Sequence, residues 1–180
     1  MRGPQVTRGY DGVPEPAVDE EGWFCTGDLA RLSEAGNLVL NGRCKEMLVT
    51  SYGKNISPQK IEVLLKGVGG VSEAMVVADG KPFTTALLWL EDDAASFDFG
   101  ALDAAVLKAN VQLSHPEQVK RWIVAAAPLS VARGELTPNL KVRRNIVAET
   151  RAALIGDLYD NWEQTPLGEA ADTLHRGEMR

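Results

Sequence analysis

The chain has 180 residues, of which 44% are hydrophobic and 24% charged, and its net charge is −6. This composition is typical of a globular protein and excludes the compositions of disordered and collagen-like chains. The acidity argues against sequence-independent nucleic-acid binding, which depends on neutralising phosphates. The longest apolar runs fall far short of the roughly 20 residues that a membrane-spanning helix needs. We therefore expect a cytoplasmic protein with no transmembrane segment.

The cysteines and histidines give no sign of a metal site. Cys25 and Cys44 are too far apart for a CxxC pair, and His115 and His175 each stand alone. Zinc needs about four soft ligands at characteristic spacing. We predict no bound metal and two buried or idle thiols.

The first forty residues read as β-rich material that cannot make its own core. Glycines and prolines interrupt residues 1–21, and short β-prone runs follow at 22–26, 29–32 and 38–40, with turn clusters between them. We expect this segment to pack on a surface outside itself.

The pattern changes to alternating helices and strands from Glu46 onward. A strand over 47–50 and a loop over 51–55 precede a helix that Ser57 caps and Pro58 begins. Ile61, Leu64, Leu65 and Val68 recur at helical spacing, and Gly67 ends the helix.

The remaining elements complete a small sheet. The predicted strands cover 74–78, 84–90 and 122–126, the first two forming an antiparallel pair joined by 79–82. A helix is expected over 98–113, a loop over 127–140, and a closing helix that carries apolar residues from Val142 to Leu158.

These elements predict an α+β fold. It has a small mixed sheet of about three strands plus a short hairpin, flanked by helices and preceded by the β-rich segment. The predicted divisions are the β-rich segment, a linker, a compact domain and a polar tail, over 1–42, 43–46, 47–160 and 161–180.

Four polar clusters follow one another in the chain. They are Thr26-Gly27-Asp28, Gly42-Arg43-Cys44-Lys45, Gly53 to Pro58 leading to Ile61-Glu62, and Leu136 to Arg144. Each alone is typical of a turn with a solvated charge. Their joint occurrence in this order is much harder to explain by chance.

Together the clusters resemble those of the AMP-forming acyl-CoA synthetases, also called adenylate-forming ligases. Gly22–Leu29 is similar to the family's GWF-x-TGD segment, and the stretch from Gly3 to Tyr10 is similar to the one ahead of it. Asn41–Glu46 resembles the family's linker. The segment Leu136–Arg144 resembles the closing motif of the long-chain fatty acid branch, where Leu-Lys replaces the usual Gly-Lys. The resemblance covers about residues 3–160 and implies the C-terminal part of such an enzyme.

The resemblance implies roles for particular residues at the nucleotide. Asp28 would bind the ribose hydroxyls of ATP, since a carboxylate can accept two hydrogen bonds from a vicinal diol. Arg43 would join it with its fork of donors. Lys45 occupies the hinge about which the C-terminal domain swings between two poses.

Further roles concern the two half-reactions. Lys141 would reach the site where a carboxylate attacks the α-phosphate of ATP and pyrophosphate leaves. Gly53 and its neighbour Lys54 would form the loop beside which the pantetheine arm of CoA passes. Simpler interpretations stay open: Lys141 and Lys54 as solvated lysines, and Glu62 as support for its helix.

The resemblance also implies what this chain lacks. The family's large N-terminal domain carries the phosphate-gripping loop, a magnesium-binding glutamate and the acyl pocket, and no such loop occurs here. We expect ATP, Mg²⁺ and CoA to serve the full-length enzyme, none to bind tightly to this chain, and the chain alone to be inactive. Its partner would be the N-terminal domain, in cis or in trans.

Other interpretations compete with this one. The chain could be a freestanding, non-catalytic accessory domain of the same fold, and the exposed β segment could support a homo-oligomer. Peripheral membrane association of the full-length enzyme is compatible with the sequence. A peptide synthetase adenylation domain fits poorly, because those domains usually show an Arg-Ile-Glu-Leu-Gly loop where this chain has Asn55 to Gln59.

Overall fold

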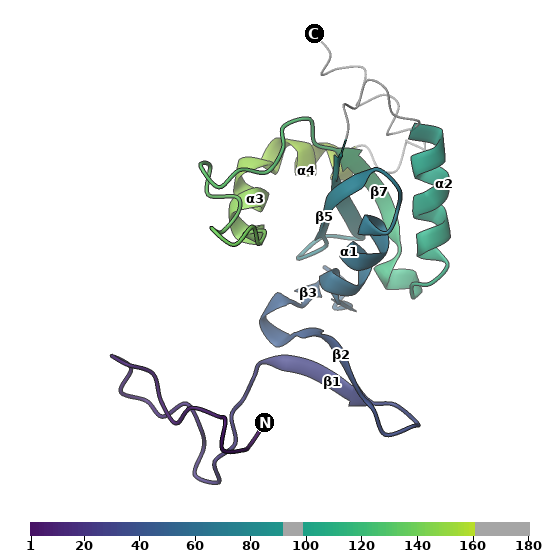
Figure 1. Ribbon diagram of the computed structural model, residues 1–180. Helices are drawn as coiled ribbons and strands as arrows, with labels where there is room; N and C mark the ends of the chain where they lie inside the picture. Colours follow the sequence, from purple (N-terminus) through teal and green to yellow (C-terminus); the bar gives the residue numbers. More distant parts are fainter. Residues whose placement is uncertain (92–98, 161–180) are drawn as a thin grey trace. The chain divides into compact units, whose positions relative to one another are not determined.

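The computed structural model describes residues 1–91 and 99–160, so the predicted tail at 161–180 lies outside the described residues (Figure 1). The chain divides into two compact units, Met1–Met47 and a second unit from Leu48 onward. Within the described ranges, no helix is long and apolar enough to cross a membrane.

The first unit is built on one two-stranded ribbon. Strands β1 (Asp28–Leu32) and β2 (Leu38–Arg43) pair antiparallel through a turn in which the Ser33 amide donates to the Asn37 carbonyl over 2.8 Å. A single 3-10 turn, η1 (Cys44–Glu46), follows β2. The ribbon leaves its largest apolar side chains exposed: Leu29, Leu32, Leu38 and Leu40. It matches the expectation of a β segment without a core of its own.

The β-prone run at 22–26 forms only an isolated bridge, between Val18 and Phe24. The chain turns sharply just before it, with Gly22 at a φ of 80°. The Asp19 carboxylate accepts the Trp23 amide over 2.8 Å, which diverts that donor from a sheet ladder. Local side-chain bonding therefore replaces the predicted strand.

The second unit contains a mixed sheet of three strands, β5 (Val71–Val77), β6 (Thr84–Leu90) and β7 (Val119–Val124), in that order. Strands β5 and β6 are antiparallel, whereas β6 and β7 are parallel. Strands β3 (Leu48–Val49) and β4 (Asn55–Ile56) form a separate short hairpin. The predicted α+β class, three-stranded sheet and hairpin are confirmed, although β7 begins three residues earlier than predicted.

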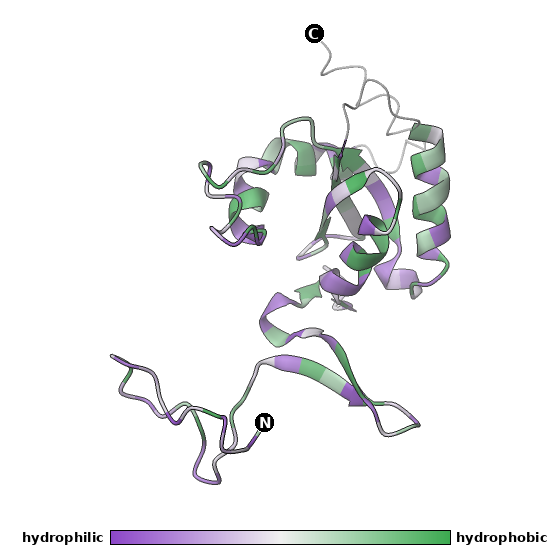
Figure 2. Ribbon diagram, viewed as in Figure 1, coloured by the Kyte–Doolittle hydropathy of each residue, from purple (hydrophilic) through white to green (hydrophobic). Residues whose placement is uncertain are grey.

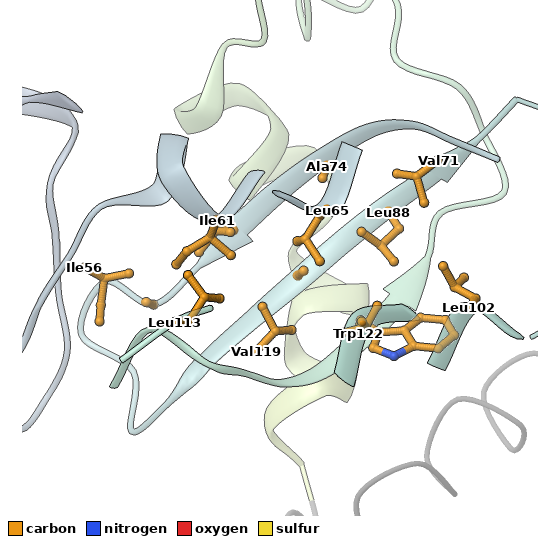
Figure 3. Packing of buried hydrophobic residues seen from close by; sticks show 14 of the residues in the cluster. Ile56, Ile61, Leu65, Val71, Ala74, Leu88, Leu102, Leu113, Val119 and Trp122 are labelled. Atoms are coloured by element: carbon orange, nitrogen blue, oxygen red, sulfur yellow. The ribbon is translucent and has the colours of Figure 1, made fainter. Parts of the chain in front are cut away.

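Two helices cover one face of this sheet (Figure 1). Helix α1 (Pro58–Lys66) packs on β5, and α2 (Phe99–Asn110) belongs to the crossover that parallel strands require, followed by the short η3 (His115–Glu117). Figure 3 shows their apolar side chains packed against residues of the strands, with Leu65 close to Leu88, Leu102 close to Trp122 and Ile61 close to Leu113. This cluster forms the larger core.

Two more helices cover the opposite face. Helices α3 (Arg144–Thr150) and α4 (Ala152–Tyr159) contribute Val147, Ile155 and Leu158 to a second core against Met75 and Leu87. Because side chains alternate along a strand, one strand supplies both cores. Figure 2 shows the central strands as predominantly hydrophobic, as expected for a sheet buried on both faces.

The closing helix was predicted as one element, and this is wrong in detail. It begins at Arg144, since Val142 pairs with Leu136 instead, and it breaks at Arg151, which has φ −111° and ψ 22°. The Thr150 hydroxyl lies 2.9 Å from the Ile146 carbonyl, a back-bond that bends helices.

The start of α1 also differs from its prediction. Pro58 occupies the first turn as expected, but Ser57 makes no side-chain capping bond there.

Helix α1 offers a matched test of the core. Ile61 is fully buried and Val63, two residues later, is 68% exposed. Ile61→Ala should destabilise the chain by about 2–5 kcal/mol, because it leaves a cavity, whereas Val63→Ala should change stability by less than about 0.5 kcal/mol. Urea unfolding followed by circular dichroism measures both. Equal effects would contradict this assignment of the helix faces.

Candidate functional site

The predicted ribose-binding pair lies together at one end of the ribbon. Asp28 and Arg43 are cross-strand partners in β1 and β2, and Arg43 Nε lies 3.3 Å from Asp28 Oδ1. Their side chains are 37% and 54% exposed, so the ion pair contributes at most about 1 kcal/mol to stability. Both groups are therefore available to a ligand at little cost to the fold.

The turn before β1 holds this pair in place. The Arg43 guanidinium donates to the Thr26 carbonyl over 3.2 Å, and Thr26 Oγ1 accepts the Asp28 amide over 3.2 Å. The Cys44 amide donates to the Gly27 carbonyl over 2.8 Å. The Thr-Gly-Asp and Gly-Arg-Cys-Lys clusters, distant in sequence, thus form one local structure.

Lys45 lies in the middle of η1, where it is exposed, two residues before the first unit ends. Cys44 precedes it, and both Cys44 and Cys25 are free and exposed, so the expectation of buried or idle thiols is wrong as to burial.

Gly53 and Lys54 lie in the tight hairpin loop between β3 and β4. The Gly53 amide donates to the Thr50 carbonyl over 2.8 Å, and the Lys54 amide donates to Thr50 Oγ1 over 3.1 Å. Gly53 has a φ of 70°, which side-chain-bearing residues rarely adopt. A Cβ atom there would meet nothing within 4 Å, so the backbone conformation, rather than crowding within the chain, calls for glycine.

A pocket of about 280 Å³ opens beside this loop. Its apolar lining comes from Tyr52, Pro82, Phe83 and Pro116, and its basic side chains are Lys54, His115 and Lys120. A partly aromatic lining with two lysines suits a flat ligand that carries phosphate.

Lys141 is exposed near the end of a tight hairpin whose arms meet at the Leu136–Val142 bridge. The Thr137 amide donates to the Lys141 carbonyl over 2.8 Å, and Thr137 Oγ1 accepts a hydrogen bond from the Lys141 amide over 3.0 Å. The backbone of the lysine is thus held while its amine remains in solvent.

Leu140 is held in a strained conformation in the same hairpin. It has a φ of 58°, and among the described residues it alone shows a positive φ without being glycine. A type I turn followed by a left-handed residue favours glycine at this place. The side chain is 69% exposed and borders a groove of about 490 Å³ that Leu136 and Trp89 also line.

An ion pair connects the lysine hairpin to helix α1. Arg144 Nη2 lies 2.6 Å from Glu62 Oε1, and Arg144 Nη1 donates to the Val76 carbonyl over 2.7 Å. Glu62 Oε1 also accepts the Val76 amide over 2.8 Å. Glu62 therefore supports more than its own helix, because it ties α1, β5 and α3 together.

A second carboxylate, Glu135, is fully buried just before the hairpin. Burial alone would raise the pKa of Glu135, but the Arg133 hydrogen bond and the charge of Arg151 outweigh it, so the pKa lies below the ordinary glutamate value.

Sequence reasoning assigned no role to the supporting residues Glu135 and Arg144 or to the pocket residues His115 and Lys120. A buried charge next to a functional loop has no periodic signal, and residues that meet only through the fold have no spacing to read. Within the described ranges, no group of three or more His, Cys, Asp or Glu residues could hold a metal ion.

The strain at Leu140 can be measured by comparing two small residues. Leu140→Gly should be more stable than Leu140→Ala by about 1 kcal/mol, because alanine keeps the left-handed penalty and glycine does not. Thermal or urea unfolding of both variants gives the difference. An alanine variant as stable as the glycine variant would contradict a strained backbone at this position.

The depressed pKa of Glu135 predicts an acid-dependent stability. The native state binds fewer protons at Glu135 than the unfolded chain, so this contribution is full above the unfolded pKa, about 4.3, and is lost as the pH falls through the folded value. Glu135→Gln should cost about 3–5 kcal/mol at pH 7 because two arginines lose their charge partner.

The test compares the two chains by urea unfolding at pH 7 and at about pH 3.5. Stability should fall more steeply with acid in the unsubstituted chain than in Glu135→Gln. Glu117, whose pKa is also lowered, is present in both chains and so cancels from the comparison. Equal pH dependence of the two chains would contradict a depressed pKa at Glu135.

Comparison with known proteins supports the motif resemblance. The AMP-binding enzyme C-terminal domain family matches residues 45–163. The long-chain-fatty-acid–CoA ligase FadD15 of Mycobacterium tuberculosis is 35% identical over 183 residues, covering 89% of this chain and 30% of the relative. The long-chain-fatty-acid–CoA ligase heimdall of Drosophila melanogaster is 30% identical, covering 88% of this chain and 32% of the relative. The chain thus spans about a third of the length of these curated relatives.

A solved structure agrees in fold. The A domain of carboxylic acid reductase from Segniliparus rugosus, which was determined with AMP and a co-purified carboxylic acid, matches with a TM-score of 0.68. The match has 22% identity and covers 79% of this chain and 24% of that one. With the family match spanning most of the second unit, this chain belongs to the AMP-binding enzyme C-terminal domain family, within the adenylate-forming superfamily that its motifs resemble.

Proposed function

We propose that this chain acts as the C-terminal part of an AMP-forming fatty acid–CoA ligase. The overall reaction joins a fatty acid to ATP, giving acyl-AMP and pyrophosphate, and then transfers the acyl group to CoA with release of AMP. The observation that carries the proposal is Lys141, which matches the closing motif of the long-chain branch and is exposed on an anchored hairpin. Two curated relatives that cover 89% and 88% of this chain are long-chain-fatty-acid–CoA ligases.

Lys141 supplies positive charge to the first half-reaction. A carboxylate oxygen attacks the α-phosphorus, and the bond to the pyrophosphate oxygen breaks. Both reactants are anionic, so an ammonium group between them reduces repulsion and stabilises the charge that develops in the transition state. A long side chain on a short hairpin can deliver that charge from a domain that moves.

Asp28 and Arg43 bind the ribose of ATP in this proposal. The Asp28 carboxylate accepts hydrogen bonds from the two ribose hydroxyls, and Arg43, 3.3 Å away, orients the carboxylate and donates to the same sugar. Their exposure supports this role, since both side chains can be reached by a ligand.

CoA binds on the side of the Gly53 loop. The pantetheine arm passes beside Gly53, and the basic pocket with Lys54 and Lys120 suits the phosphates at the nucleotide end of CoA. The described residues offer no cluster fit to hold Mg²⁺, so we assign its ligands to the N-terminal domain and derive no step through it.

The partner in this proposal is an N-terminal AMP-binding domain, of which residues 1–42 form the last part. The exposed leucines of β1 and β2 support this assignment, because such apolar surface usually marks an interface. Residues 43–46 form the linker, Lys45 the hinge and 47–160 the mobile domain. We place the enzyme in the cytoplasm, and peripheral membrane association of the full-length protein is compatible with the sequence.

The test reconstitutes adenylation by adding this chain to a separately produced N-terminal domain of a long-chain ligase. The chain should increase fatty-acid-dependent pyrophosphate release above that of the N-terminal domain alone. With Lys141→Ala, the increase in pyrophosphate release should be at least about 100-fold smaller, because one preorganised charge is lost.

Lys108→Ala is the matched control, since Lys108 is an exposed lysine on α2 far along the chain from the motif. It should leave pyrophosphate release unchanged. No stimulation by the chain, or equal activity of the Lys141→Ala and Lys108→Ala variants, would contradict the proposal.

A non-catalytic accessory domain is the second candidate, and the exposed apolar side chains of β1 and β2 are what favour it. In that case the chain would bind a partner, or a second copy of itself, through the ribbon. Leu38→Lys would abolish that binding, whereas Lys141→Ala would have no effect in any assay.

A further inference from the structure

The strongest unexplained feature of the second unit is the charge of Glu135, which has no exposure to solvent yet precedes the exposed Lys141 by only six residues. Burying a carboxylate is unfavourable unless charge and hydrogen bonds compensate it. A surface loop can fold without a buried carboxylate. The contacts of the Glu135 carboxylate show which parts of the chain it holds together.

Both carboxylate oxygens of Glu135 are fully engaged. Oε1 accepts a hydrogen bond from Arg151 Nε over 3.1 Å and lies 3.2 Å from Thr150 Oγ1. Oε2 accepts hydrogen bonds from Arg133 Nε over 2.9 Å and from the Ser130 amide over 3.1 Å. Arg151 and Thr150 stand at the break between α3 and α4, whereas Arg133 and Ser130 belong to the loop, so Glu135 joins the loop to the helix pair.

The backbone of Glu135 forms the base of the lysine hairpin. Its carbonyl accepts the Arg143 amide over 2.8 Å, next to the Leu136–Val142 bridge. The hairpin therefore leaves the body of the domain between two fixed residues, Glu135 and Arg143. Because the carboxylate cannot leave its arginines without becoming an unpaired buried charge, rotation of this base is strongly opposed.

The other anchor of the hairpin lies on its far side. Arg144 is held by Glu62 and by the Val76 carbonyl, which fixes the chain directly after Arg143 to α1 and β5. The hairpin thus has one anchor at each end, and of these two anchors Glu135 is the one that connects to the loop before it.

We propose that Glu135 is a positioning residue for Lys141, whose buried carboxylate fixes the base of the hairpin and so sets where the lysine amine reaches. The proposal rests on the proposed role of Lys141 in adenylation. It adds that the direction of the amine is set by a charge network inside the domain. Positioning matters because a displacement of about 1 Å can cost about 100-fold in rate.

The first test uses the 180-residue chain alone and needs no activity. In Glu135→Gln, backbone amide exchange at Lys141 and Arg143 should become roughly tenfold faster, since the amide keeps the size of the side chain but loses the charge that holds Arg133 and Arg151. Amides in β5, β6 and β7 exchange through global unfolding, so their exchange should speed up only by the amount that the loss of unfolding free energy measured in urea predicts. Glu149→Gln, at an exposed glutamate of α3, is the control and should leave the hairpin protected.

The second test separates the two half-reactions in the reconstituted enzyme. Glu135→Gln should lower kcat for acyl-AMP formation by roughly 10- to 100-fold with little change in the KM for ATP. Thioester formation from supplied acyl-AMP and CoA should stay within about twofold, because that step does not use Lys141. Equal losses in both half-reactions would indicate general damage to the fold and overturn the proposal, as would an unchanged adenylation rate.

A milder variant covers the case in which Glu135→Gln does not fold. Arg133 is 47% exposed and supplies only one of the two arginine contacts, so Arg133→Gln should keep the fold and show the same half-reaction split, with a smaller loss. A folded Arg133→Gln with no such split would overturn the proposal.

Failure of this proposal can be told apart from failure of the proposed function. If Lys141→Ala abolishes adenylation while Glu135→Gln leaves adenylation and hairpin exchange unchanged, only the positioning role fails. If Lys141→Ala leaves adenylation unchanged, the proposed function fails, and positioning for catalysis fails with it.

Discussion

The second unit depends on burying a three-stranded sheet on both faces. Every residue of β6 from Thr84 to Trp89 is buried, and only Leu90 at its end is partly open to solvent. Functional groups therefore have to lie on the connections. The Gly53 hairpin, which carries Lys54, and the Lys141 hairpin are connections between elements of this sheet and its helices, and Lys120 lies at the start of β7. Loops held by a rigid scaffold are where binding and catalytic residues usually occur.

In the same unit, the exposed charged groups and the buried ones have different proposed roles. The groups proposed to meet substrates, such as Lys141 and Lys54, are exposed and form no ion pair within the described part of the chain. The charges that hold the loops, Glu62 and Glu135, are paired with arginines and largely or wholly withdrawn from water. A paired charge in a low-dielectric site resists displacement, whereas a solvated lysine can reorient freely. This division suits a domain that must present one flexible amine from a fixed base.

The first unit shows the opposite balance. Its two-stranded ribbon has no core, and its apolar side chains lie on the surface, yet its turn positions Asp28 and Arg43 through hydrogen bonds to the Thr26 hydroxyl and carbonyl. A ribbon of this size is marginally stable by itself. The arrangement fits a segment whose stability comes from a further surface, and the proposed ribose-binding pair is ordered locally by its turn.

The sequence by itself determined the elements with a clear period or punctuation. The stripe from Ile61 to Val68 predicted α1, the turn at 79–82 predicted the β5–β6 pair, and the order of the motifs identified the family. It did not place Val119 in β7 or the break at Arg151, because both depend on pairing and back-bonding between neighbours rather than on local propensity. The tertiary structure alone decided that Glu135 is buried, that Arg144 meets Glu62 and that Leu140 is strained. Those contacts join residues separated by up to 82 positions, and no spacing along a chain encodes which charges the packed helices will exclude from water.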